Sequence, residues 1–135
     1  MKTLIIEDDH NTAQFFFEAA HSQGLEDVDI VPSAEEALEQ ILNTSYDLIT
    51  LDVHLPGASG LQILSALRAM SPSAIIAIIS GHLPGDIEPS TAECADVMLE
   101  KPVSVKTLCT LLNNVKQIHI ANHNIRALEN RSTEE

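Results

Sequence analysis

Five side chains with acid, base or hydroxyl chemistry come close after short apolar stretches of the sequence. They are Glu7, Asp8, Asp52, Ser80 and Lys101. Short stretches rich in β-branched residues predict buried strands, and ligands of open α/β sheets bind beyond the carboxyl ends of such strands. We therefore expect these five side chains to meet at one edge of a sheet.

The five side chains together suit one kind of chemistry. Three carboxylates in one cleft repel each other unless a positive charge lies among them. Mg²⁺ fits such a place, because it prefers oxygen ligands and uses one or two carboxylates plus a phosphate oxygen. Lys101 adds a second cation and Ser80 a hydroxyl donor. Transfer of a phosphoryl group onto a carboxylate needs this combination of nucleophile, metal, cation and donor.

Strand-like and helix-like segments alternate along the chain. The predicted strands are 3–6, 28–31, 47–51, 74–79 and 97–99. The predicted helices are 11–23, 33–43, 59–69 and a long last helix from Ser104. Capping boxes mark the second and third helices, with Ser33 before Glu36 and Ser59 before Gln62. The alternation predicts an α/β fold with a parallel, doubly wound sheet and helices on both faces.

Two helices have unusual sequences. The fourth helix must fit between Ser80 and Cys94, where two prolines and two glycines leave space for about two turns from Pro89. The first helix carries three consecutive phenylalanines, Phe15 to Phe17. These span about 200° of the helical wheel, so one core-facing stripe cannot cover all three. One of them is either a partly covered boundary residue or part of a docking surface.

Length and composition exclude several classes of protein. A chain of 135 residues is enough for one domain without disulfides, and Cys94 and Cys109 are predicted to be reduced thiols in a cytoplasmic protein. The chain has 7 basic and 20 acidic residues, a net charge of −13, which argues against a nucleic-acid surface. We expect no signal peptide, because Met1-Lys2 leads directly into a strand-like segment, and no segment approaches the ~20 apolar residues of a membrane span.

Four motifs in order resemble the receiver domain of two-component response regulators. They are Leu4-Ile5-Ile6-Glu7-Asp8-Asp9, Leu51-Asp52-Val53-His54-Leu55-Pro56-Gly57 with Gly60, Ile78-Ile79-Ser80-Gly81-His82, and Leu99-Glu100-Lys101-Pro102. The resemblance covers residues 1–118. It implies the flavodoxin-like strand order 2-1-3-4-5, and it leaves 119–135 as a helical extension and a disordered tail.

The resemblance also implies roles for single residues. Asp52 is the expected phosphoacceptor. Asp8 directly, Glu7 through water, and the backbone carbonyl of His54 are the expected ligands of Mg²⁺. Lys101 is expected to contact the phosphoryl group, and Ser80 to report its presence. The Lys101–Pro102 bond is expected to be cis, while Asp9 opens the first helix.

The expected activity follows from those roles. The phosphoryl group would come from a phosphohistidine of a histidine kinase or phosphotransfer protein. The product would change a surface that binds a downstream effector or an output domain outside this sequence. The protein would catalyse only its own phosphorylation and dephosphorylation, and would not act as an enzyme on other substrates.

Three features depart from the usual pattern of the family. Met98 occupies the place three residues before the lysine where an aromatic residue is usual. The fourth helix is short. His54, with His82, lies where it would affect the lifetime of an acyl phosphate.

The last helix has apolar residues at the a and d spacing of a coiled coil. The stripe comprises Leu108, Leu111, Val115, Ile118, Asn122 and Ile125. Two arrangements of the last helix fit this pattern. In one, the first half of the helix covers the sheet and the second half frays. In the other, the helix protrudes and forms a homodimer with a second copy. Arg131 to Glu135 is predicted to be disordered.

Other functions remain open from the sequence. A phosphatase of the haloacid dehalogenase type would need Asp-x-Asp where this chain has Asp52-Val53-His54. A flavin-binding module would need a phosphate-binding loop where Glu7 and Asp8 stand. A phosphorylation-independent adaptor or dimerisation module on the receiver fold is the main alternative, and Met98 keeps it open.

Overall fold

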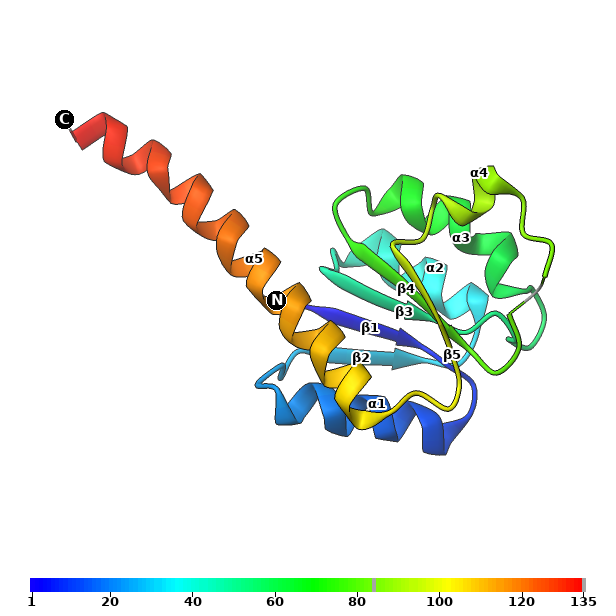
Figure 1. Cartoon of the computed structure of the whole chain (residues 1–135). Coiled ribbons are helices and arrows are strands. Elements are labelled where there is room, and N and C mark those ends of the chain that lie inside the picture. Colours follow the sequence, from blue (N-terminus) through cyan, green and yellow to red (C-terminus); the bar gives the residue numbers. More distant parts are fainter. Residues whose placement is uncertain (84, 135) are drawn as a thin grey trace.

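A computed structural model describes residues 1–83 and 85–134, with side chains up to residue 129. In these residues five parallel strands form one sheet in the order β2-β1-β3-β4-β5, as predicted (Figure 1). The strands are β1 (Thr3–Ile6), β2 (Val28–Val31), β3 (Leu48–Leu51), β4 (Ile75–Ser80) and β5 (Val97–Glu100). Each observed strand begins and ends within one residue of its prediction.

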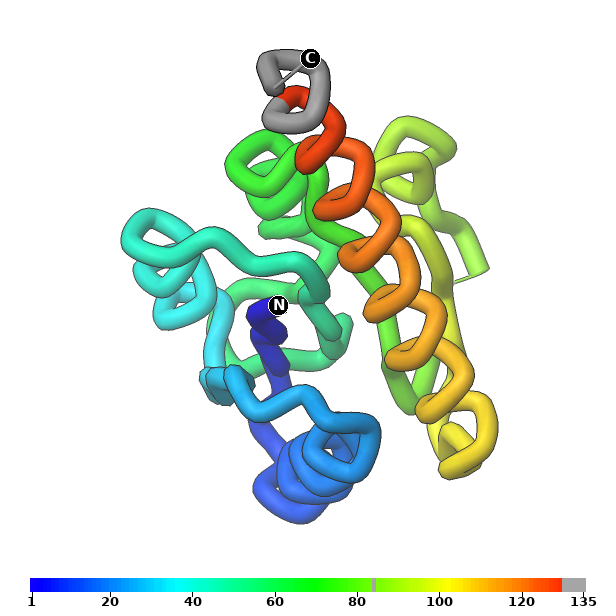
Figure 2. The backbone as a smooth tube through the Cα atoms, turned by 90° about the vertical axis from the view of Figure 1, so that its left-hand side faces the viewer, coloured from blue at the N-terminus to red at the C-terminus, as the bar shows by residue number. Residues whose placement is uncertain are grey.

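Helices cover both faces of the sheet, which confirms the doubly wound arrangement (Figures 1 and 2). The helices are α1 (His10–Ser22), α2 (Ala34–Asn43), α3 (Gly60–Met70), α4 (Pro89–Ala92) and α5 (Val105–Glu134). On one face α1 and α5 pack on Ile5, Leu48, Ala77 and Ile79. On the other face α2 and α3 pack on Leu4, Ile49, Leu51, Ile76 and Ile78. Alternate strand residues therefore serve the two cores.

Side-chain caps fix where three helices begin. Asp9 accepts a hydrogen bond from the Thr12 amide at 2.9 Å and opens α1. Ser59 and Gln62 form both bonds of a capping box at α3. Ser33 accepts from the Glu36 amide, which is the first half of the predicted box at α2. These caps place the loops that follow β1 and β3.

The connection between β4 and β5 contains little helix. α4 has four residues and begins at Pro89, as predicted. Arg68 of α3 holds the end of this connection, because its guanidinium donates to the Cys94 carbonyl at 3.0 Å and to Asp96 at 2.7 Å. A third bond reaches the Ala74 carbonyl before β4 at 2.7 Å. Arg68 thus links α3 to the end of this connection and to the residue before β4.

The last helix is extended, as predicted, and runs past the edge of the sheet where the strands begin (Figure 1). Leu108, Leu112 and Val115 are buried in the core against α1. Leu108 and Val115 belong to the first half of the predicted stripe, so the alternative in which this half covers the sheet is confirmed. The backbone of α5 continues to Glu134, where disorder was predicted from Arg131, and Glu135 lies outside the described residues. None of the described helices has both the length and the apolar character of a membrane span.

Candidate functional site

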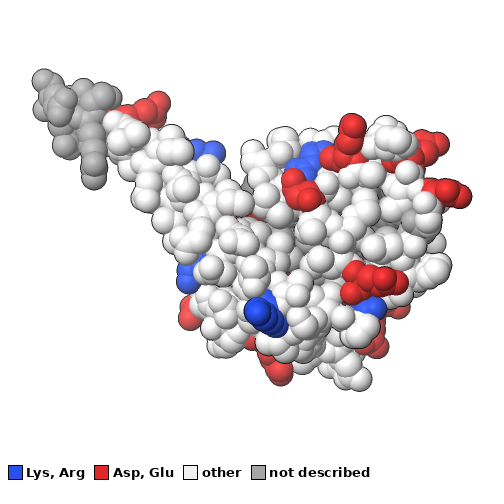
Figure 3. Space-filling model, in the orientation of Figure 1, with Lys and Arg blue, Asp and Glu red and all other residues white. Residues whose placement is uncertain are grey.

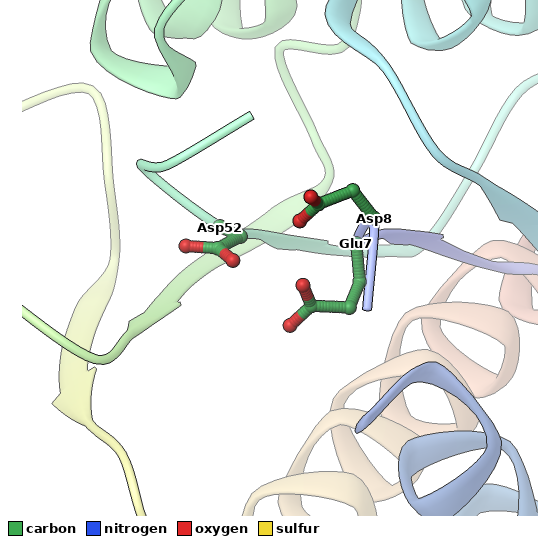
Figure 4. A group of neighbouring side chains, drawn as sticks. All are labelled: Glu7, Asp8 and Asp52. Carbon is green, nitrogen blue, oxygen red and sulfur yellow. The ribbon is translucent and has the colours of Figure 1, made fainter. Parts of the chain in front are cut away.

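The predicted site residues meet at the carboxyl edge of β1, β3 and β4. Parallel pairing aligns Ile6 with Leu51, so the residues that follow them are neighbours. The Asp52 amide donates to the Ile6 carbonyl at 3.1 Å, and the Lys101 amide donates to the Ser80 carbonyl at 2.8 Å. Figure 4 shows the side chains of Glu7, Asp8 and Asp52 close together at the ends of their strands. The sheet itself brings these groups together.

Asp52 is buried, with 6% of its surface exposed. Its Oδ1 accepts from Ser80 Oγ and from the His54 amide, each at 3.0 Å. Its Oδ2 lies 3.2 Å from Lys101 Nζ. Burial raises the pKa of Asp52, but hydrogen bonding with Glu7, the His54 amide and Ser80, together with the charge of Lys101, outweighs burial and holds the pKa below its ordinary value. The carboxylate is therefore ionised at neutral pH.

Glu7 lies deeper and has a different electrostatic environment. It is 2% exposed, and the Lys101 ammonium bonds directly to its carboxylate. Burial, followed by the neighbouring Asp52, raises the pKa of Glu7 to about 7, although Lys101 opposes the shift. As pH rises, Asp52 therefore loses its proton before Glu7 does.

Lys101 is the cation of the site. Burial lowers the pKa of this lysine, but its bonds to Glu7 and Asp52 and their charges outweigh burial and raise it. The Lys101–Pro102 peptide is cis, as predicted. Lys101 therefore stays charged while it contacts both buried carboxylates.

The raised pKa of Glu7 predicts a pH dependence of stability without metal. Between about pH 4.5 and 7 the folded Glu7 keeps a proton that the unfolded chain has lost, so Glu7 makes the free energy of unfolding fall as pH rises, by on the order of 3 kcal/mol. Urea unfolding of the wild type and of Glu7→Gln in EDTA measures this. The difference between the two proteins should change over that range; a constant difference would contradict the assignment.

The acidic group could hold a metal ion. Glu7, Asp8 and Asp52 each offer a carboxylate oxygen, and these ligand atoms lie within 4.8 Å of one another. Asp8 is exposed at the mouth, whereas the other two are buried. Oxygen ligands alone suit a hard divalent cation better than a soft one. The His54 amide points to Asp52, while the ligand role of the His54 carbonyl stays a prediction.

Two histidines lie at the rim beside Asp52. His54 Nε2 is 3.2 Å from the His82 carbonyl, and the two rings are stacked with centroids 6.3 Å apart. Both residues are exposed. The loops after β3 and β4 are therefore joined through the two histidines that the sequence analysis named together.

The surroundings of Lys101 contain features that the sequence did not reveal. An open pocket of about 520 Å³ lies between the start of α1 and the Lys101 loop. It is lined by Asn11, Thr12, Phe15, Phe16, Lys101, Pro102 and Val103. Phe16 is buried, while Phe15 and Phe17 are half-buried. The three consecutive phenylalanines were the available signal for this pocket.

Met98 occupies β5 opposite Ile78 of β4. It is half-buried and packs against the core that lies under α2 and α3. A thioether fills space but offers no hydroxyl. A signal that passes through this position must therefore act through packing.

Comparisons with known proteins agree with this geometry. The family model of the response regulator receiver domain matches residues 3–113. The two-component response regulator PhoP of Pseudomonas aeruginosa is 35% identical over 84% of this chain and 50% of its own length. The cell cycle transcriptional regulator CtrA of Caulobacter vibrioides is 37% identical over 76% of this chain and 44% of its own length. The chain thus spans about half the length of these curated relatives.

Solved structures give the same result. A response regulator receiver domain from Methylobacillus flagellatus is 31% identical, with a TM-score of 0.75 over 85% of this chain and 98% of its own. A response regulator protein from Burkholderia pseudomallei, with a phosphorylated aspartic acid, calcium ion and citrate, is 26% identical, with a TM-score of 0.74 over 96% of this chain and 74% of its own. From its sequence, strand order and acidic site, the chain belongs to the response regulator receiver domain family.

Proposed function

We propose that the chain is a phosphorelay receiver that takes a phosphoryl group from a phosphohistidine onto Asp52 in a Mg²⁺-dependent reaction. The observation that carries the proposal is the environment of Asp52. This ionised carboxylate contacts a hydroxyl, a backbone amide and an ammonium group. The similar structure from Burkholderia pseudomallei, with its phosphorylated aspartic acid, supports the same chemistry here.

Protein groups around Asp52 each have a part in the chemical step. A carboxylate oxygen of Asp52 attacks phosphorus, the bond from phosphorus to the histidine nitrogen breaks, and its electron pair stays on the imidazole. The Lys101 ammonium compensates charge on the phosphoryl oxygens. The Ser80 hydroxyl, which now donates to Asp52 at 3.0 Å, would donate to a phosphoryl oxygen in the product. That change at Ser80 is the start of the signal toward β5.

Glu7, Asp8 and Asp52 would hold Mg²⁺, together with the backbone carbonyl of His54. Their oxygen atoms fit a hard cation in type and spacing. When bound, Mg²⁺ supplies positive charge for the phosphoryl oxygens. The residues themselves keep the acceptor ionised and oriented.

The phosphodonor would approach over α1. The pocket beside Lys101 opens between α1 and the loop after β5 and has an apolar lining that includes Phe15. An apolar patch next to a reactive group suits the side of a partner helix. This location would bring a phosphohistidine of a kinase or phosphotransfer protein to Asp52. The phosphorylated chain would then act on an effector or on a further domain.

Uptake of a phosphoryl group tests the proposal. With acetyl phosphate and Mg²⁺, intact mass spectrometry should show the gain of one phosphoryl group on the wild type. Asp52→Asn should show none. Asp9→Asn keeps the cap of α1 and should behave as the wild type. If neither acetyl phosphate nor a phosphohistidine donor modifies the wild type, the chain is instead a phosphorylation-independent adaptor.

The histidine pair at the rim predicts the lifetime of the phosphorylated form. His54 and His82 contact each other beside Asp52, and there they would restrict the path of water to a phosphoryl group. His54→Ala and His82→Ala should each speed loss of phosphate, by up to about tenfold. The exposed His21 of α1 provides a matched control in His21→Ala. Mass spectrometry can follow the decay of the phosphorylated form of each variant. Lifetimes equal to that of the wild type would refute a role for the histidine pair.

A further inference from the structure

The second half of α5 presents an apolar stripe that nothing in the described chain covers. Every residue from Ile120 to Glu129 is exposed. Ile118, Ile125 and Leu128 are 46%, 63% and 55% exposed. Ala121 completes the series, so the stripe consists of Ile118, Ala121, Ile125 and Leu128. Its spacing of three, four and three residues is that of a coiled-coil seam.

We propose that this stripe pairs with the same stripe of a second copy to form a parallel, two-stranded coiled coil. Ile118 and Ile125 occupy the a positions of the heptad, and Leu128 occupies a d position. β-branched residues at a with leucine at d favour two parallel strands over larger assemblies. The stripe is also narrow, which suits one partner helix better than a broad apolar surface.

The residues that flank the stripe permit self-association. The flanking e and g positions are Gln117, Asn122, Asn124 and Glu129. In a parallel pair the g position faces the next e position of the partner, so Asn124 meets Glu129 without repulsion between like charges.

The distribution of charge along the chain also favours a second copy as the partner of the stripe. Residues 1–115 contain 17 acidic and four basic residues, the whole of the net charge, whereas residues 116–135 contain three of each. Figure 3 shows acidic side chains over the body in this view, and an extension that is largely uncharged. Two bodies of the same negative charge repel at close approach. The protruding helix (Figure 1) is the part through which two copies meet with least repulsion.

The extension continues a helix that the core already holds through Val115. Its backbone bonds therefore need no new nucleus, but its apolar stripe stays in contact with water. Pairing would bury that stripe and add to the stability of the extension. The stability of the extension should therefore depend on protein concentration.

Oligomeric state tests the proposal on the 135-residue chain. Sedimentation equilibrium should show a molar mass that rises toward twice the monomer value with concentration, and the helical circular dichroism signal should rise with it. Ile125→Asp should abolish both changes. Ile120→Asp places the same charge on the same helix at a residue that is 41% exposed and off the stripe, and should leave the dimer intact. A wild type that stays monomeric up to about 1 mM overturns the proposal.

Cross-linking tests the orientation in a background where Cys94 and Cys109 are serine. In a parallel pair, Ile118→Cys alone and Leu128→Cys alone should each form disulfide-linked dimers. Cross-linking only when the two variants are mixed would overturn the parallel arrangement. Binding of the stripe to lipid vesicles by a monomeric chain would contradict a second copy as its occupant. Phosphorylation of Asp52 is measured separately, so failure of this proposal leaves the proposed function untouched.

Discussion

Gly60→Ala should impair both folding and phosphorylation, although the change adds one methyl group. A Cβ at Gly60 would lie closer to the Asp52 carbonyl oxygen than real Cβ atoms approach, and 3.0 Å from the Val53 Cα. These neighbours are backbone atoms, and the Gly60 amide donates to the Val53 carbonyl at 2.9 Å. The start of α3 is therefore pressed against the residues that follow β3.

The expected loss of stability is about 3 kcal/mol, because backbone cannot yield as a flexible side chain does. The shift would also move Asp52 away from Ser80 and Lys101, so phosphoryl uptake should fall by at least about tenfold. Urea unfolding and the acetyl phosphate reaction measure the two effects. Gly81→Ala is the matched control, since a Cβ there meets nothing within 4 Å. Equal behaviour of the two variants would show that the close approach is unimportant.

The sequence predicted the elements well because their signals are local. Strands appeared as apolar stretches, and helix starts appeared as caps such as Asp9 and Ser59. The site followed from topology, since parallel strands bring the residues after their carboxyl ends to one edge. Glu7, Asp52 and Ser80 needed only the strand order to become neighbours.

Features that depend on packing between distant segments could not be predicted. Gly60 was visible as part of a motif, but its contact with the Asp52 carbonyl requires the position of α3. Arg68 joins α3 to residues near 74 and 94–96, a bond network without sequence pattern. The spacing of the apolar residues of α5 did not show by itself that Leu108 and Val115 pack in the core.

Lys101→Met should destabilise the protein by about 3 kcal/mol at neutral pH, because it leaves two buried carboxylates without their cation. Glu7 and Asp52 side chains are 1% and 8% exposed, while that of Lys101 is 21% exposed. Because Lys101 is partly exposed, the expected loss of stability lies at the lower end of the range observed when one partner of a buried ion pair is removed. Lys101→Arg keeps the charge and serves as the control.

The variant also separates the electrostatic role of Lys101 from its packing. Without the ammonium, the pKa of Glu7 should rise further, so the loss of stability should shrink as pH falls from 8 to 5 and Glu7 gains its proton. Glu7→Gln combined with Lys101→Met should recover much of the loss, because one unpaired charge is removed. Urea unfolding of the four proteins in EDTA gives this cycle. A loss that is independent of pH and unchanged by Glu7→Gln would show that Lys101 supports the fold through its alkyl chain alone. The Lys101 charge has two proposed functions: it balances the buried acids in the resting protein, and it stabilises the phosphoryl group during transfer. A double variant that recovers stability but not phosphorylation would separate these two functions.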